Sequence, residues 1–146
     1  MGEAITIRAL GPADLDLLLT LPDGVFDHPV LPEQAAAFLA DPGHEMVVAL
    51  VDGIPVGFAS ATVLLHPDKP PALFVNEVGV RDDWRRRGIA TRLMKRLIAL
   101  GRDRGCVGTW LGTEPDNEPA LGLYRKLGGE ELMIVGFAWD GAFDED

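Results

Sequence analysis

The sequence has one cysteine, no long hydrophobic run and no histidine cluster, and each of these absences excludes a class of protein. Cys106 has no partner for an internal disulfide, which excludes a disulfide-stapled secreted scaffold. No apolar run reaches the roughly 18 residues that a membrane span needs, and no leader-like segment opens the chain. The histidines His28, His44 and His66 lack the spacing of metal ligands, so no metal is expected. We expect a soluble, cytoplasmic protein with no membrane partner.

What the sequence does have is enough chain for one hydrophobic core. Its 146 residues are 47% hydrophobic and 25% charged, which is the composition of an ordinary globular protein. No repeat, linker or low-complexity stretch divides them. We expect a single domain over residues 1–146.

Basic residues are scarce outside one segment. Residues 81–104 hold nine of the thirteen lysines and arginines against three acidic residues, a balance of +6, and the rest of the chain has four against twenty, a balance of −16. One interpretation is a site for an anionic ligand within an acidic body that attracts a cationic one. The alternative is a solvated basic helix face on an acidic surface. Nucleic acid is not expected as a partner, because the net charge of −10 repels phosphate backbones.

Hydrophobic periodicity and turn residues predict six strands and four helices. The strands are expected at residues 5–9, 45–51, 54–65, 72–80, 106–113 and 132–139, and the helices at 11–19, 32–40, 88–104 and 118–127. Asp52 and Gly53 are the expected two-residue hairpin turn, and Asp116 or Asn117 is the expected cap of the last helix. This order predicts an α/β (α+β) fold, with a mixed sheet covered by helices.

A basic, glycine-containing turn, residues 85–88, joins the strand at 72–80 to the helix at 88–104. Backbone N–H groups at a helix start have no internal partners, and the helix dipole adds positive potential there. Gly88 lets the chain approach a ligand closely. The turn therefore predicts a phosphate-binding site.

Two motifs then resemble the signatures of the GCN5-related N-acetyltransferase (GNAT) superfamily. The first, Arg85-x-x-Gly88-x-Ala90, resembles its acyl-CoA signature, and the second, Asn117-x-x-Ala120-x-x-Leu123-Tyr124-x-x-Leu127-Gly128, resembles a later one. With the strand order, the resemblance covers roughly residues 5–139. It implies a mostly antiparallel sheet splayed between the fourth and fifth strands, about four flanking helices, and acetyl-CoA as co-substrate.

The resemblance also implies a path for CoA along the chain. The backbone of the turn would hold the pyrophosphate, and the end of the preceding strand would pair with the pantetheine arm. The residues implied are Val78, Gly79, Val80, Arg85, Arg86, Arg87, Gly88, Ile89, Ala90, Thr91 and Asn117. Gly79 suggests a bulge or a close backbone approach, and the alternative is simple core packing.

Tyr124 looks like the family's general acid, the phenol that protonates the departing CoA thiolate. From the residues alone, a tyrosine on a helix face with Ala120, Leu123 and Leu127 is more typical of a core. The surrounding motif favours the catalytic interpretation.

Glu77 is the candidate base, because a carboxylate in an otherwise apolar strand is costly to bury without a partner or a task. It would take a proton, directly or through a water, from the acceptor's ammonium, since only a neutral amine attacks a thioester. A structural salt bridge is the alternative. Glu114 and Asp116 would join Glu77 in binding a cationic acceptor, although both could equally be loop carboxylates or helix caps.

Other residues with reactive side chains are not assigned to the chemistry. Ser60 and Cys106 lack a nucleophile motif, and direct acetyl transfer needs no covalent intermediate. A backbone N–H near Val78 to Val80 is the expected donor to the developing oxyanion.

The acceptor is less well specified than the donor. The compact length, the proline-rich loop before the Glu77 strand and the acidic 114–118 segment look most like type I aminoglycoside 3-N-acetyltransferases. That resemblance implies N-acetylation of a small cationic antibiotic, and hence antibiotic resistance. The alternatives are another small amine such as a polyamine or amino acid, a protein or peptide amine, and a non-enzymatic acyl-CoA sensor. The apolar C-terminal strand is a candidate homodimer interface.

Overall fold

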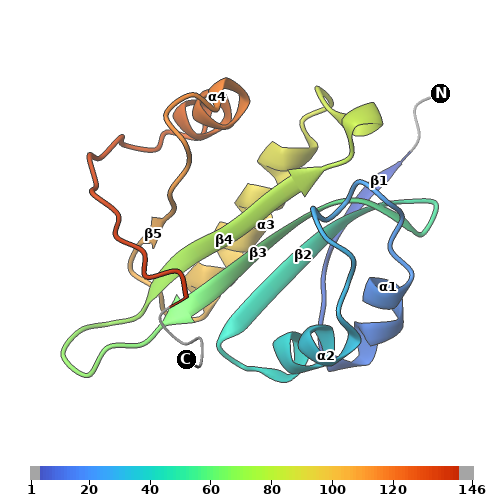
Figure 1. The fold of residues 1–146 in the computed structure, drawn as a ribbon, viewed down its shortest axis with the longest axis horizontal. Helices are drawn as coiled ribbons and strands as arrows, with labels where there is room; N and C mark the ends of the chain where they lie inside the picture. Colours follow the sequence, from blue (N-terminus) through green and yellow to red (C-terminus); the bar gives the residue numbers. More distant parts are fainter. Residues whose placement is uncertain (1–3, 142–146) are drawn as a thin grey trace. The chain divides into compact units, whose positions relative to one another are not determined.

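A computed structural model describes residues 4–141, and the chain divides into two compact units, Met1–Thr113 and Glu114–Asp146. The described part of the first unit contains one sheet and three α-helices, and that of the second contains one α-helix (Figure 1). No helix within residues 4–141 is both long enough and apolar enough to cross a bilayer.

The sheet of the first unit has the strand order β1-β2-β3-β4-β5. Its strands are β1 (Ile5–Ala9), β2 (His44–Val51), β3 (Ile54–Leu64), β4 (Ala72–Val80) and β5 (Thr109–Trp110). The first four pair antiparallel, and β5 runs parallel to β4. The predicted hairpin between β2 and β3 is confirmed, because Asp52 and Gly53 have the positive φ angles, 51° and 77°, that a tight turn of this twist requires.

Helices cover both faces of this sheet (Figure 1). The helices of the first unit are α1 (Leu15–Leu19), α2 (Pro32–Ala40) and α3 (Ile89–Asp103), with short 3-10 turns at η1 (Pro12–Asp14) and η2 (Asp82–Trp84). α3 packs against β2, β3 and β4, and α2 packs against β2 from the other face. The predicted fold class, a mixed and mostly antiparallel sheet with helices against it, is confirmed within the first unit, and α4 (Glu118–Lys126) of the second unit is the fourth α-helix of the described residues.

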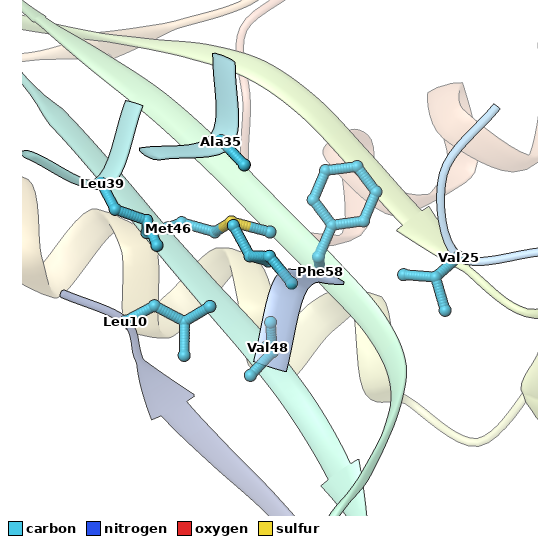
Figure 2. Close-up of a cluster of buried hydrophobic side chains, with 8 residues drawn as sticks. Leu10, Val25, Ala35, Leu39, Met46, Val48 and Phe58 are labelled. Carbon is cyan, nitrogen blue, oxygen red and sulfur yellow. The ribbon is translucent and has the colours of Figure 1, made fainter. Parts of the chain in front are cut away.

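Alternate residues of the central strands supply two cores. Met46, Val48 and Phe58 join the cluster beneath α1 and α2, together with Leu10, Leu18, Val25, Ala35 and Leu39 (Figure 2). On the α3 side, Leu93 and Leu97 are fully buried. A Cβ on Gly101 would lie 2.8 Å from Leu73 Cδ2, so α3 reaches β4 this closely only because residue 101 has no side chain.

β4 contains the irregularity that was expected, but at a different residue. Ser60 pairs with Glu77 and Ala61 with Val75, so Asn76 is the extra residue of the bulge. The Thr62 hydroxyl donates a hydrogen bond of 3.0 Å to the Asn76 side-chain oxygen. Gly79 instead pairs regularly with Phe58, and the prediction of a bulge at Gly79 was wrong.

Two predicted strands differ from the structure. The strand expected at 106–113 shortens to Thr109–Trp110, because residues 106–108 make irregular backbone hydrogen bonds, such as Val107 N–H to Pro71 O at 3.0 Å. The strand expected at 132–139 was wrong, since no described residue pairs with it and its large apolar side chains are exposed. An apolar, β-branched run favours extended backbone, but a strand exists only where a neighbour accepts and donates its hydrogen bonds.

Candidate active site

The turn between β4 and α3 holds two residues in the left-handed region. Arg86 has φ of 64° and Gly88, which precedes the first residue of α3, has φ of 74°. Arg81 anchors the start of the turn through its N–H, which donates to Val56 O at 2.9 Å. The chain thereby reverses within a few residues, and α3 starts close to the end of β4 in sequence and in space.

The start of α3 presents free hydrogen-bond donors. The first bond of the helix runs from Arg92 N–H to Gly88 O at 3.1 Å, and no side chain among residues 4–141 caps the helix. The N–H groups of Ile89, Ala90 and Thr91 therefore lack intrahelical acceptors. Free donors, the helix dipole and a glycine that lets a ligand approach are what an anionic group needs.

The three arginines of the turn are exposed and differ in their contacts. Arg85 Nε lies 3.2 Å from Asp82 Oδ1, and the Arg87 guanidinium lies 4.3 Å from the centre of the Trp84 ring. Arg86 makes no ion pair with any residue in the described range 4–141. The turn therefore carries positive charge that its own carboxylates only partly balance.

Among the strands of residues 4–113, the C-terminal half of β4 has a neighbour on one side only. Val78, Gly79 and Val80 pair with β3, whereas β5 pairs with β4 only at Leu73 and Phe74. Within residues 4–113, the other edge of β4 beyond residue 74 thus keeps backbone groups without a strand partner. The β4–β5 separation agrees with the predicted splay, and such an edge can pair with an extended ligand that carries amides.

Position 79 requires glycine, because Phe58 and the backbone of Val25 lie too close to it for a side chain. A Cβ at this position would lie 2.9 Å from Phe58 Cε1 and 3.1 Å from Val25 O. The close-approach interpretation of Gly79 is therefore confirmed, with the loop before α2 as the approaching backbone.

Two cavities adjoin this part of β4, and they share the residues Asp27, Phe58 and Glu77. The larger has a volume of 330 Å³ and lies between the sheet and the segment that runs from α1 to α2. The smaller has a volume of 160 Å³ and is also lined by Val78 and Gly79. Glu77, Val78 and Gly79 are consecutive in β4, so this part of the strand lines the cavities and also carries the unpaired backbone edge.

Glu77 lies at this junction, although not in the setting that was expected. Its side chain is exposed rather than buried, because the bulge at Asn76 alters the alternation of β4 just before it. None of the ion pairs within residues 4–141 includes Glu77, so the structural salt bridge finds no support there. An exposed carboxylate on a cavity wall is available to a substrate.

Asp27 is the residue that sequence reasoning missed. It lies in the irregular segment between α1 and α2 and lines both cavities beside Glu77. Its neighbours Gly24 and Pro29 marked only a loop, and no local pattern indicated that the loop folds onto β4. Ser60, which pairs with Glu77 across the sheet and is 6% exposed, also lines the larger cavity.

In the second unit, Tyr124 lies on α4 and is partly buried. Burial raises the pKa of the Tyr124 phenol above its ordinary value of 10.0, so the group stays protonated at neutral pH. Asn117 caps α4, and its side-chain oxygen accepts a hydrogen bond of 3.2 Å from Ala120 N–H. The predicted cap is confirmed, and a protonated phenol is the form that a general acid requires.

The remaining predicted residues of the second unit are exposed. The Glu114 backbone oxygen accepts from Asn117 N–H at 3.1 Å, and the Asp116 oxygen accepts from Glu118 N–H at 3.0 Å. Their carboxylates form no ion pair within the described part of the chain, so both are open to a cationic ligand. Their role in acceptor binding stays a prediction.

No group of histidine, cysteine, aspartate and glutamate side chains within residues 4–141 is arranged to hold a metal ion. His28 lines the larger cavity, whereas the Nδ1 of His44 lies 3.4 Å from Asp41 Oδ1.

Comparison with known proteins gives relatives that include named N-acetyltransferases. The chain is 35% identical over 135 residues to the N-alpha-acetyltransferase RimI of Mycobacterium tuberculosis, which covers 90% of this chain and 82% of that protein. It is 30% identical over 94 residues to an aminoglycoside N(6′)-acetyltransferase type 1 of Salmonella typhimurium, covering 62% of this chain and 65% of that one. A further match, to a Mycobacterium leprae protein, is 35% identical over 137 residues but spans only 36% of that protein.

Solved structures show the same fold. The aminoglycoside N-acetyltransferase AAC(6′)-Iy in complex with CoA has a TM-score of 0.78 and 25% identity, covering 95% of this chain and 96% of that one. The ribosomal-protein-alanine N-acetyltransferase of Brucella melitensis has a TM-score of 0.70 and 25% identity, covering 92% and 100%. The family model of the acetyltransferase (GNAT) family matches residues 15–129. Because that match spans most of the 146 residues and includes both motifs, the chain belongs to the acetyltransferase (GNAT) family.

Proposed function

We propose that the chain is an acetyl-CoA-dependent N-acetyltransferase that transfers the acetyl group directly to a primary amine of a small cationic acceptor. The observation that carries this proposal is the continuity of β4. Its open backbone edge ends in the donor-rich turn before α3, and the same strand presents Glu77 to a cavity. One strand can thus hold a donor and receive an acceptor.

The residues of the chain suit CoA. The free N–H groups at Ile89 to Thr91 and the exposed Arg85, Arg86 and Arg87 would bind the pyrophosphate and the remaining phosphate. The edge of β4 at Val78 to Val80 would pair with the amides of the pantetheine arm. Asn117, whose side chain caps α4, is proposed to contribute to CoA binding from the start of that helix.

The chemistry asked of the side chains is proton transfer. Glu77 would take a proton from the acceptor's ammonium, directly or through a water, and free the nitrogen lone pair to attack the acetyl carbonyl carbon. A backbone N–H near Val78 to Val80 would donate to the carbonyl oxygen as it gains negative charge. The carbon–sulfur bond then breaks, and Tyr124 would give its proton to the thiolate. The nitrogen keeps a surplus proton after the attack, and the release of that proton to the Tyr124 phenolate, directly or through a water, leaves a neutral amide and restores the phenol. The products are an N-acetyl amine and CoA.

An aminoglycoside is one candidate acceptor. The acidic balance of −16 outside residues 81–104 favours a polycation, and Glu114 and Asp116 add exposed carboxylates to Glu77. Two of the similar proteins are named as aminoglycoside 6′-N-acetyltransferases. The resemblance stated from sequence was to the 3-N type, so the acetylated nitrogen is a separate question, and a role in antibiotic resistance depends on the acceptor.

A peptide N-terminus is a second candidate. It is supported by the 35% identity to RimI, a match that covers 82% of that protein. An N-terminal ammonium would use the same base, Glu77.

The test is thiol release from acetyl-CoA with the full chain and three acceptors. These are an aminoglycoside that carries both a 3-amine and a 6′-amine, the diamine putrescine, and a peptide with N-terminal alanine. We expect amine-dependent thiol release above the rate without amine, and NMR of any acetylated aminoglycoside would identify the modified nitrogen. Binding of acetyl-CoA without thiol release in any arm would overturn the enzymatic proposal and favour the acyl-CoA sensor. A sedimentation measurement on the same sample would test the predicted homodimer.

A further inference from the structure

The larger cavity is lined mainly by apolar side chains, which is unexpected for a site that receives a polycation. Nine of its fourteen lining residues are apolar, and they come from α1, the loop before α2, α2, β2 and β3. Phe26 and Phe58 form part of this wall, with ring centres 4.3 Å apart, and Phe38 and Met46 add to it. The wall is continuous with the buried cluster shown in Figure 2, to which Met46 and Phe58 belong.

The carboxylates of the cavity are gathered toward β4. Asp27 and Glu77 are the two lining residues that also line the smaller cavity and that carry negative charge. The smaller cavity is also lined by Val78 and Gly79, which belong to the part of β4 proposed to lie beside the thioester. The larger cavity therefore has a charged end toward the proposed chemistry and an apolar interior away from it.

We propose that the acceptor is a primary amine that carries an apolar group about the size of one aromatic ring, with the ammonium held by Asp27 and Glu77 and the apolar group in the 330 Å³ cavity. This inference rests on the proposed acetyltransferase activity and names its acceptor class. A volume of 330 Å³ lies at the small end of ligand cavities, which span about 300–1,000 Å³.

Physical chemistry separates this class from a polyhydroxylated sugar. Hydroxyl groups placed against Phe26, Phe58 and Met46 would lose water without gaining hydrogen bonds from those side chains. Besides the two carboxylates, only His28, Gln34 and Ser60 among the lining residues offer polar side chains, which is fewer partners than a polyhydroxylated body needs. An alkyl or aryl group has no such penalty, and each buried methylene strengthens binding by roughly fourfold. The cavity thus selects for the part of the acceptor next to the amine, whereas charge selects only for the amine.

The first measurement needs no substitution. Thiol release with the full chain is compared across ethylamine, butylamine and 2-phenylethylamine, which have the same charge and increasing apolar bodies. We expect kcat/KM to rise by roughly fourfold per methylene as the body grows, with 2-phenylethylamine above putrescine and above the aminoglycoside. A peptide with N-terminal phenylalanine is assayed separately. It carries the same ammonium and aromatic ring, so its rate shows whether the acceptor is a peptide or a free amine.

The second measurement fills the cavity. Ala35 lines it and is 9% exposed, whereas its neighbour Ala36 on the same helix is exposed and does not line it. We expect Ala35→Phe to lower the ratio of kcat/KM for 2-phenylethylamine to that for ethylamine by about tenfold. Ala36→Phe, the matched control, should leave that ratio unchanged. The melting temperature of each variant reports folding, and if Ala35→Phe does not fold, the amine series on the unchanged chain decides alone.

The outcomes separate this inference from the activity on which it rests. If ethylamine, putrescine or the aminoglycoside is acetylated as fast as 2-phenylethylamine, the enzyme stands and the apolar acceptor is wrong. If no amine releases thiol, the proposed acetyltransferase activity is wrong. Calorimetry then compares the affinities of the chain for 2-phenylethylamine and for ethylamine, and so tests the cavity without turnover. Equal binding of the two amines would overturn the apolar acceptor in that case as well.

Discussion

The turn at residues 81–91 and the cavity beneath α1 and α2 differ in the groups that they offer to a ligand. The turn presents backbone N–H groups and depends on two left-handed residues, Arg86 and Gly88, that are close in the chain. The cavity presents side chains from α1, the loop before α2, α2, β2, β3 and β4, which span residues 18 to 77. A backbone site recognises a group common to many substrates, such as a phosphate, and a side-chain site recognises the shape and polarity of one. This difference explains why the donor can be inferred from the turn alone, whereas the class of acceptor can be inferred only from the cavity.

The largest expected effect tests the side-chain region. Glu77→Gln keeps the size of the side chain and removes the base, so we expect kcat to fall by about a thousandfold at neutral pH. The affinity for acetyl-CoA, measured by calorimetry, should change little, because the groups proposed to bind CoA are the backbone of Val78 to Val80 and the turn before α3, not the Glu77 side chain. The control is Glu33→Gln, which makes the same carboxylate-to-amide change at an exposed residue of α2 outside the cavity. An unchanged kcat in Glu77→Gln would remove Glu77 from the chemistry and leave only a binding role.

The next effect concerns the acid, which belongs to neither region. Tyr124→Phe removes the phenol hydroxyl, and we expect kcat to fall by about a hundredfold with acetyl-CoA affinity nearly unchanged. Because burial raises the pKa of Tyr124 above 10.0, the loss of activity due to its ionisation should have its midpoint above pH 10 in the unchanged protein. The pH profile of kcat checks this, and a basic limb that persists in Tyr124→Phe would assign that limb to another group.

The third effect tests the backbone region. Gly88→Val forces a β-branched residue into φ of 74°, a strain of about 1–3 kcal/mol. The turn would relax and move the free N–H groups, so KM for acetyl-CoA should rise by about tenfold, with the preference among amines unchanged. Gly112→Val places the same residue at a glycine with open space and no positive φ, and it should leave KM unchanged. A shift in amine preference with Gly88→Val would break the division into two regions.

The smallest expected effect lies where the two regions meet. A Cβ on Gly79 would lie 2.9 Å from the Phe58 ring and 3.1 Å from Val25 O, so Gly79→Ala must displace the cavity wall or the loop backbone. We expect a loss of about 1–3 kcal/mol in the free energy of unfolding and a rise of a few-fold in both KM values. Denaturant unfolding and steady-state kinetics measure the two quantities. A change in only one KM would show that Gly79 serves a single region.

Local sequence patterns predicted most elements of the first unit. The strand Ile5–Ala9, the helix Pro32–Ala40 and the strand Ala72–Val80 were predicted at their exact bounds, and the Asp52–Gly53 hairpin was confirmed. These elements have clear periodicity with proline or glycine at their ends, and their hydrogen bonds are local or lie in the central sheet. The strand expected at 132–139 has the same apolar signal and was wrong, because pairing depends on a neighbour that local sequence does not specify.

The candidate site divides in the same way. The turn before α3 and the cap at Asn117 follow from residues a few positions apart, and both could be inferred from spacing. The exposure of Glu77 could not, since the bulge that turns it outward is at Asn76 and exists only in the pairing with β3. Asp27 could not be inferred either, because a loop carboxylate gains its place from the segment packing back onto the sheet.

By itself, the sequence determined the order of strands and helices in the first unit, the glycine-containing turn with its excess of positive charge, and the two motifs that indicated the family. Each of these depends on interactions between residues near in the chain, where periodicity, capping and backbone conformation dominate. Only the tertiary structure decided that Asp27 joins Glu77, that β4 has no second strand partner beyond Phe74 among residues 4–113, and that an apolar cavity of 330 Å³ lies beside the carboxylates. Those features arise from long-range packing, in which residues far apart in the sequence close a volume that none of them encodes alone.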